Sequence, residues 1–298
     1  MEIIADTKEF YIERETAVAI GKFDGVHLGH RRLLDEILLA KKRGLAACVF
    51  TFDPPPAVFF GRDQRVLSTL EEKRRLFEHL GVDFLIEFPM NRDTAATPPR
   101  DFVTQYLVNQ LNTRFIAAGP DISFGDRGLG NALLLESMAE ECGFEVRLVD
   151  KVRDSLGREI SSSLVREAVQ RGELESVTEL LGMPYSFTGT VIHGNHLGHD
   201  LGFPTVNMRI PAEKLLPPLG VYESKVLCGE ECYSGISNIG VKPTIGGEDT
   251  PLIETYIKDF SGDLYGKELT IELMSFKRPE KRFESIDELR AQLAQDCI

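Results

Sequence analysis

The hydrophobic positions near the start of the chain predict a strand, a helix and a second strand. Residues 17–23 and 45–52 are mostly apolar at successive positions, as strands buried on both faces of a parallel sheet are. The intervening residues 31–44 carry their apolar side chains at helical spacing. Gly44 ends this segment at the position where a left-handed residue commonly stops a helix.

The same alternation continues to about residue 149. Three further helix–strand pairs are predicted, at residues 68–88, 100–119 and 131–149. Ser68 and Glu71 have the spacing of a capping box, which predicts that the first of these helices begins at Ser68. About five strands joined by helical crossovers predict a doubly wound α/β sheet.

From residue 185 onward the pattern changes to short alternating strands separated by Gly, Pro and Thr. Two helical segments, residues 162–172 and 173–182, precede this change. The short strands predict an antiparallel barrel or sandwich, and residues 285–296 predict a terminal helix packed against it. We therefore expect an α/β domain at residues 1–182 and a β domain at residues 183–298.

Length, composition and charge agree with a folded two-domain protein. The chain has 298 residues, more than one ordinary core needs, and 42% of them are hydrophobic. No apolar stretch approaches the roughly 20 residues that cross a bilayer, and the N-terminus does not resemble a signal peptide, so we expect a cytoplasmic protein. The net charge of −13 repels nucleic acid and anionic lipid. We expect neither as a partner, and an anionic substrate then needs local features such as helix N-termini, backbone amides or a metal.

The five cysteines are scattered, which favours reduced thiols over a disulfide framework. Only Cys228 and Cys232 are close together. As half of a zinc site they would need a second ligand pair, which the sequence lacks. The interpretation that we favour is a hairpin that turns at Gly229.

The segment GKFDGVHLGH, residues 21–30, joins the first predicted strand to the first predicted helix. This junction lies at the carboxyl edge of a parallel sheet, where ligands bind. His27 and His30 would lie at the helix N-terminus, which favours an anion, and Gly25 and Gly29 let the backbone approach a ligand. The imidazoles could donate hydrogen bonds to phosphate oxygens during attack on phosphorus. Alternatively, the two histidines only cap the helix. The segment contains neither a P-loop nor a dinucleotide fingerprint.

GKFDGVHLGH resembles the HxGH signature of nucleotidyltransferases, and its longer form is similar to that of the bacterial bifunctional riboflavin kinase/FMN adenylyltransferases, also called FAD synthetases. TFDPPP at residues 51–56, AGPDISFG at 118–125 and ISSSLVR at 160–166 resemble that family's TFDPHP, GxDFxFG and SSTxxR. The resemblance implies a Rossmann-like nucleotidyltransferase domain in which His27 and His30 are catalytic. It implies ATP or FMN contacts for Gly21, Phe23, Asp24, Gly25, Gly29, Asp53, Asp121, Ser161, Ser162, Ser163 and Arg166. By chemistry alone the three serines are also a helix cap.

LGFPTVN, residues 201–207, is the strongest motif of the second half and is similar to the riboflavin kinase LGFPTAN. Thr205 and Asn207 are two apart on a strand and therefore point to the same face. Their oxygens, together with nucleotide phosphates, could hold Mg²⁺, which takes few protein ligands. The glycine-rich residues 193–202 could form a loop over phosphates. Taken alone, the motif is also compatible with a glycine-rich hairpin that contains a buried threonine.

Four further segments follow in the family's order and approximate spacing, at residues 236–244, 253–256, 263–266 and 278–283. The resemblance implies a riboflavin-kinase-type β-barrel in which Glu254 is the general base that takes the proton of the ribityl 5′-hydroxyl. By its charge alone, Glu254 does not stand out. The resemblance also implies ATP or flavin contacts for Gly194, Gly198, Gly202, Pro204, Asn238 and Arg278.

The chain departs from the family's usual residues at Pro55, Ile122, Ser163, His199, Asp200 and Tyr256. His199 and Asp200 replace an Arg-Thr pair, so a permanent positive charge near the ATP phosphates is lost and a negative charge is added.

The sequence therefore predicts a two-step enzyme that uses ATP as co-substrate. The first step phosphorylates riboflavin to FMN with Mg²⁺, and the second transfers AMP from another ATP to FMN, giving FAD and pyrophosphate. We expect a monomer or weak oligomer. Two alternatives stay open: a chain that retains one of the two activities, and a non-catalytic flavin-binding regulator.

Overall fold

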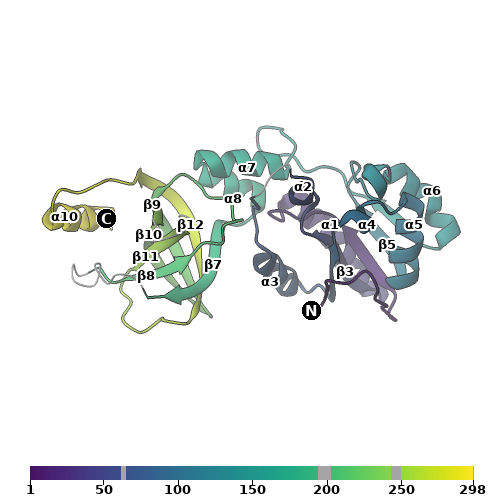
Figure 1. Ribbon diagram of the computed structural model, residues 1–298, viewed down its shortest axis with the longest axis horizontal. Helices are drawn as coiled ribbons and strands as arrows, with labels where there is room; N and C mark the ends of the chain where they lie inside the picture. Colours follow the sequence, from purple (N-terminus) through teal and green to yellow (C-terminus); the bar gives the residue numbers. More distant parts are fainter. Residues whose placement is uncertain (62–64, 194–202, 243–249, 298) are drawn as a thin grey trace. The chain divides into compact units, whose positions relative to one another are not determined.

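The structure is a computed structural model that forms two compact units, Met1–Ser162 and Ser163–Ile298 (Figure 1). The residues that it describes are 1–61, 65–193, 203–242 and 250–297. Helices α7 (Ser162–Arg171) and α8 (Leu174–Leu181) follow the division, although the sequence pattern assigned them to the first domain. The domain boundary expected after residue 182 stays a prediction. Within the described ranges, no helix is long and apolar enough to cross a membrane.

The first unit contains a six-stranded parallel sheet of order β1-β4-β3-β2-β5-β6. Its strands are β1 (Glu2–Ala5), β2 (Thr16–Ile20), β3 (Ala46–Asp53), β4 (Phe84–Pro89), β5 (Thr113–Ala118) and β6 (Glu145–Leu148). The predicted doubly wound sheet is confirmed, with one strand more than the five expected. The additional strand β1 has only four residues and no fully buried position. Its apolar run, Ile3–Ala5, is too short to indicate a strand by itself.

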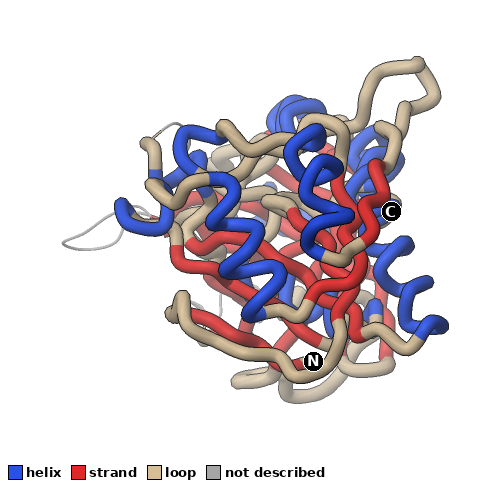
Figure 2. The backbone as a smooth tube through the Cα atoms, turned by 90° about the vertical axis from the view of Figure 1, so that its right-hand side faces the viewer, coloured by secondary structure: helices blue, strands red, loops and turns tan. Residues whose placement is uncertain are grey.

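Helices connect these strands (Figure 2, helices blue and strands red). They are α1 (Leu28–Ala40), η1 (Lys41–Arg43), α2 (Pro56–Phe59), α3 (Leu70–Leu80), α4 (Arg92–Ala95), α5 (Pro99–Asp101), η2 (Phe102–Gln110), η3 (Asp126–Gly128) and α6 (Ala132–Cys142). The first predicted helix ends at Gly44 in the left-handed conformation, as expected. The helix expected at residues 100–112 is formed by α5 and the π-helix η2.

Helix α3 begins one residue later than the predicted capping box of Ser68 and Glu71. Thr69 is the N-cap: its side chain accepts a hydrogen bond from the backbone N of Glu72 at 3.3 Å, and its backbone N donates to the Glu72 carboxylate at 2.9 Å. Both pairs have the same spacing in the sequence. The hydrogen bonds of Thr69 and Glu72 therefore identify which pair forms the capping box, which the spacing alone could not do.

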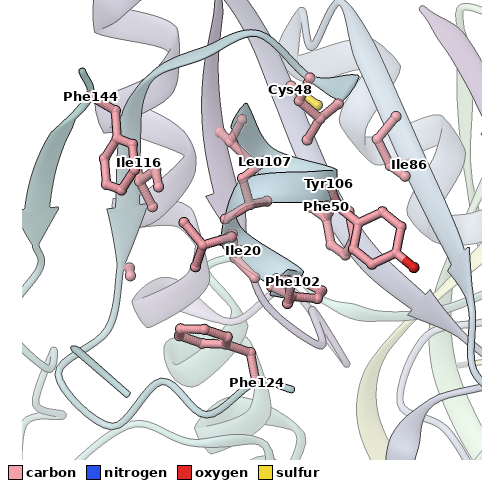
Figure 3. Packing of buried hydrophobic residues seen from close by; sticks show 14 of the residues in the cluster. Ile20, Cys48, Phe50, Ile86, Phe102, Tyr106, Leu107, Ile116, Phe124 and Phe144 are labelled. Carbon is pink, nitrogen blue, oxygen red and sulfur yellow. The ribbon is translucent and has the colours of Figure 1, made fainter. Parts of the chain in front are cut away.

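Alternate residues of the central strands pack on opposite faces of the sheet. Val18 and Ile20 of β2 face a cluster that includes Phe102 of η2 (Figure 3). Ala17 and Ala19, also on β2, face a second cluster with residues of α1 and α3. Both faces are covered, which explains why the strand sequences are apolar throughout.

The second unit contains a closed barrel of order β10-β11-β8-β7-β12-β9, whose paired neighbours are antiparallel. Its elements are β7 (Tyr185–Ile192), β8 (Thr205–Arg209), β9 (Gly220–Cys228), β10 (Glu231–Lys242), β11 (Thr250–Ile257), β12 (Glu268–Pro279) and the terminal helix α10 (Ile286–Asp296). The predicted antiparallel barrel and terminal helix are confirmed.

The β9–β10 hairpin turns at Gly229, as predicted, with Gly229 at a φ of 61°. Cys228 pairs with Glu231, and Cys232 pairs with Leu227. Because side chains alternate along a strand, the two cysteines point to opposite faces of the hairpin. This register does not bring them together as ligands of one metal.

Replacing Thr69 by Ala should lower the free energy of unfolding of the first unit by about 1 kcal/mol, because the first turn of α3 loses its side-chain cap. Urea unfolding followed by circular dichroism measures this difference. Ser68→Ala is the matched control and should cost less than half as much, since Ser68 lies outside the capping box. A larger loss for Ser68→Ala than for Thr69→Ala would contradict the assigned start of α3.

Candidate active sites

The first candidate site follows β2 at the switch point of the sheet. The chain runs from β2 through β3 to β4 on one side, and then to β5 and β6 on the other side of β2. Ligands of open α/β sheets bind at the carboxyl ends of the strands where the order reverses. Residues 21–27, which join β2 to α1, occupy this point.

His27 and His30 form a stacked pair at the beginning of α1. The helix begins at Leu28, earlier than the sequence pattern indicated, and His27 is its N-cap. The backbone N of His30 donates to Nδ1 of His27 at 3.4 Å. The two rings stack with centroids 3.8 Å apart and an interplanar angle of 20°. His27 therefore caps the helix, as the alternative interpretation held, and both imidazoles lie at its N-terminus.

Burial keeps both imidazoles neutral near pH 7. Desolvation lowers the pKa of His27 to about 4. Burial also lowers the pKa of His30, and the positions of His27 and Lys73 lower it further. A neutral imidazole has one N–H donor and one acceptor. Within the described chain, the buried Nδ1 of His30 has no hydrogen-bond partner.

The loop before α1 has an unusual backbone. Gly25 has a φ of 80°, which glycine adopts freely, but Phe23 and Val26 also have positive φ values of 49° and 44°. A β-branched residue such as Val26 rarely adopts this conformation, and such strain concentrates at functional sites. A Cβ on Gly29 would lie 3.1 Å from the His27 ring. Gly29 therefore makes room for the imidazole itself.

Asp24 ties this loop to two other segments of the first unit. Its carboxylate accepts a hydrogen bond from the backbone N of Leu67 at 2.7 Å, and its backbone O accepts from the hydroxyl of Ser162 at 2.9 Å. The hydroxyl of Thr51, on β3, donates to the backbone O of Lys22 at 3.2 Å. These hydrogen bonds fix the loop between β2 and α1 to the segments that contain Thr51, Leu67 and Ser162.

A cavity of about 850 Å³ opens beside the stacked histidines. This volume is in the range of small-molecule sites. The predicted residues that line it are Gly21, His27, Gly29, His30, Asp121 and Ser162. Asp121 is largely exposed, and its carboxylate lies 3.3 Å from Nζ of Lys151.

The other predicted residues of this site do not line the cavity. They are Phe23, Asp24, Gly25, Asp53, Ser161, Ser163 and Arg166. The Phe23 side chain is fully buried and its ring supports the His30 ring at 5.0 Å, so a ligand contact by this side chain is not supported. Asp53 lies at the end of β3. Burial raises the pKa of its carboxyl group, and the negative charge of the nearby Glu87 raises it further. Ser163 and Arg166 belong to the second unit, and their contacts stay predictions.

Sequence reasoning missed the aromatic and cationic side chains of the cavity. The aromatic ones are Phe52, Phe59, Phe60, Phe88, Phe102 and Phe124, and the cationic ones are Lys22, Arg92, Arg127 and Lys151. The strand-end rule identifies part of this set, because Phe52, Phe88 and Lys151 lie at or just beyond the carboxyl ends of β3, β4 and β6. The lining thus combines an apolar aromatic surface with charges of both signs, since Asp126, Asp150 and Glu159 also line the cavity.

The second candidate site is a row of residues across neighbouring barrel strands. Asn207 of β8 is directly opposite Glu254 of β11, and Glu254 is opposite Asn238 of β10. Asn238 in turn pairs with Val221 of β9, which pairs with Arg278 of β12. We call Asn207, Glu254, Asn238, Val221 and Arg278 the ladder row. The barrel register therefore aligns four residues that the sequence predicted from separate motifs.

Alternation of buried side chains places Glu254 on the outside of the barrel wall. Thr255 and Ser237 are fully buried, and their hydroxyls lie 2.7 Å apart inside the barrel. The neighbouring Glu254 therefore points outward, on the same face as its partner Asn207. Asn207 is nevertheless only 5% exposed.

Thr205 and Pro204, which the sequence also predicted as site residues, lie beside the ladder row on or next to β8. Thr205 pairs with Tyr256 one step along the same face, and the Tyr256 ring contacts that of Phe203 at 5.4 Å. The Nδ2 of Asn238 donates to the carboxylate of Glu280 at 3.4 Å. Pro204 is exposed beside β8. The predicted residues Gly194, Gly198, Gly202, His199 and Asp200 lie outside the described residues.

The chemistry of Thr205 and Asn207 fits Mg²⁺. A hydroxyl oxygen and an amide oxygen on one face of β8 are hard donors, and Mg²⁺ takes oxygen ligands while keeping several waters or phosphate oxygens. In the described part of the chain, no three His, Cys, Asp or Glu side chains are grouped as metal ligands. The ligand assignment stays a prediction.

Comparisons with known proteins match both units. Residues 10–164 match the FAD synthetase family and residues 181–298 match the riboflavin kinase family. The bifunctional riboflavin kinase/FMN adenylyltransferases of Listeria monocytogenes and Escherichia coli K12 are 37% and 38% identical; the alignments cover 97% and 94% of this chain and 93% and 90% of those proteins. The chain belongs to this bifunctional family.

A solved structure resembles the whole chain. It comes from Streptococcus pneumoniae and is described as a macrolide-efflux protein. The TM-score is 0.86 at 28% identity, covering 99% of this chain and 96% of that one. The resemblance that the motifs suggested is thus confirmed for the family and for the fold.

The neutral histidines predict a pH-dependent stability. His27 has a folded-state pKa of about 4 against 6.5 for the ordinary side chain, so the unfolded chain binds the proton first as the pH falls. Stability is therefore unaffected by His27 above pH 6.5 and falls between pH 6.5 and 4, by roughly 3 kcal/mol. Urea unfolding at several pH values should give a shallower fall for His27→Gln. Parallel curves for both proteins would contradict the buried neutral state.

Proposed function

We propose that this chain makes FAD from riboflavin in two ATP-dependent steps, with one site in each unit. The barrel phosphorylates riboflavin to FMN, and the α/β unit adenylylates FMN to FAD. Family membership supports the pair of reactions. The stacked histidines belong to the first unit and the ladder row to the second, which supports two sites. The observation that carries the proposal is that each matched family covers a unit with its own cluster of candidate residues, the stacked histidines in one and the ladder row in the other.

In the adenylylation step, a phosphate oxygen of FMN attacks the α-phosphorus of ATP, and pyrophosphate leaves. FMN phosphate is already ionised, so the protein has to position two anions and stabilise charge. His27 and His30 supply N–H donors at a helix N-terminus, where the helix dipole adds to the attraction. A nearby phosphate favours the charged form of an imidazole, in opposition to the burial that lowers the pKa of both histidines.

In the phosphorylation step, the ribityl 5′-hydroxyl attacks the γ-phosphorus of ATP, and ADP leaves. Glu254 takes the hydroxyl proton, while Asn238 and Arg278 lie in the same ladder row to orient the reactants. Thr205 and Asn207 would hold Mg²⁺, which supplies charge neutralisation at the ATP phosphates. The remaining predictions, a cytoplasmic location and a monomer or weak oligomer, complete the proposal.

Supplying riboflavin and FMN separately tests the two activities. With Mg·ATP, the purified chain should convert riboflavin to FMN and FAD, and FMN to FAD, because each unit matches the family of one of the two reactions. Chromatography of the flavins measures each product. If FMN accumulates from riboflavin without FAD, the chain has only the kinase activity. If FAD forms only from added FMN, the chain has only the adenylyltransferase activity. No turnover of either flavin would favour a flavin-binding regulator and contradict both reactions.

Substitutions at the two sites should separate the reactions. His30→Ala removes a donor of the first site and should lower FAD formation from FMN by about 100-fold or more, while FMN formation from riboflavin is unchanged. Glu254→Gln removes the base and should do the reverse, by a similar factor. Initial rates with each flavin measure both effects. Equal loss of both activities in either variant would argue against separate sites.

A further inference from the structure

The ladder row ends in an ion pair with the terminal helix α10. Nη2 and Nε of Arg278 lie 2.5 and 2.9 Å from the carboxylate oxygens of Asp296. The Asp296 side chain is 4% exposed and that of Arg278 is 21% exposed. Nε2 of Gln292, one turn earlier in α10, donates to the same carboxylate at 3.0 Å. A buried carboxylate with this many donors is fully engaged, and its guanidinium partner is fixed in orientation.

We propose that Asp296 is a positioning residue for riboflavin phosphorylation, which holds the Arg278 guanidinium at the end of the ladder row so that its free N–H groups face the substrates. This inference rests on the proposed role of the ladder row. Arginine has five N–H donors. Within the described residues, the bonds to Asp296 and to the backbone O of Pro279 use three of them, which leaves two for a phosphate or flavin oxygen.

The benefit of the ion pair is preorganisation. A free arginine side chain loses much rotamer freedom when it binds an anion, and a guanidinium that is already fixed avoids part of that loss. The carboxylate also neutralises the arginine when no substrate is bound, which allows Arg278 to be mostly buried. Asp296 therefore acts on binding through the direction of the Arg278 donors, without touching the substrates itself.

A second bond to the same helix end provides a matched control. Nζ of Lys258, which follows β11, donates to the backbone O of Cys297 at 2.7 Å. Lys258 thus also holds the end of α10 to the barrel, but it lies outside the ladder row. If Asp296 mattered only because it tethers α10, loss of Lys258 would have the same effect on the reaction.

Steady-state kinetics of the full chain with riboflavin and ATP tests the proposal. Asp296→Asn should raise the KM for ATP or riboflavin by roughly tenfold, with a smaller change in kcat, because a charge-assisted bond that orients a binding group is lost. Asp296→Glu should recover part of the affinity. Lys258→Met should leave both KM values within about twofold of the parent. Thermal unfolding of each variant, followed by circular dichroism, verifies that the barrel is folded.

Arg278→Ala and the Arg278→Ala/Asp296→Asn double variant complete the test. If Asp296 acts through Arg278, the double variant binds as weakly as Arg278→Ala alone. Equal KM effects of Lys258→Met and Asp296→Asn, or normal kinetics of Asp296→Asn beside an impaired Arg278→Ala, would overturn the inference while the proposed function stands. Normal kinetics of Arg278→Ala would instead show that Arg278 is not part of the proposed site. The inference about Asp296 would then be overturned as well.

Discussion

Strand pairing is the constraint on which both candidate sites depend. In the first unit, β2 lies between β3 and β5, so the segment that follows it opens where the strand order reverses. In the barrel, one register aligns Asn207, Glu254 and Asn238 across three strands. A slip of one residue would turn Glu254 toward the buried hydroxyls of Ser237 and Thr255. The hydrophobic alternation that fixes the barrel core therefore also fixes the outward position of the candidate base.

Desolvation gives the first site its chemical character. The stacked imidazoles of His27 and His30 are kept neutral by burial, so the site presents N–H donors without a permanent charge. The strained Val26 and the small Gly29 bring the His27 ring over the first turn of α1. In the proposed reaction an acidic chain that repels anions on average would bind phosphate here, because the donors and the helix N-terminus act at short range.

Periodicity predicted most of the fold, and its failures have local causes. Strand β1 was missed because its apolar run, Ile3–Ala5, has only three residues and none of them is fully buried. The start of α3 was misplaced because Thr69–Glu72 repeats the spacing of Ser68–Glu71. The phenylalanines of the cavity, such as Phe52 and Phe88, have the sequence signal of core residues. Asp296 gave no signal at all, because its partner Arg278 is 18 positions away and meets it only when α10 packs on the barrel.

The two sites differ in how far the sequence alone could define them. His27 and His30 are three residues apart and meet through one turn of helix, so their pairing is a local property that a motif can reveal. The residues of the ladder row come from different strands, and only the closed barrel brings them together. Motifs could name Asn207, Glu254, Asn238 and Arg278 separately, but their alignment is a consequence of long-range register. A partner such as Asp296, which belongs to no motif and acts through one of them, becomes visible only in the folded chain.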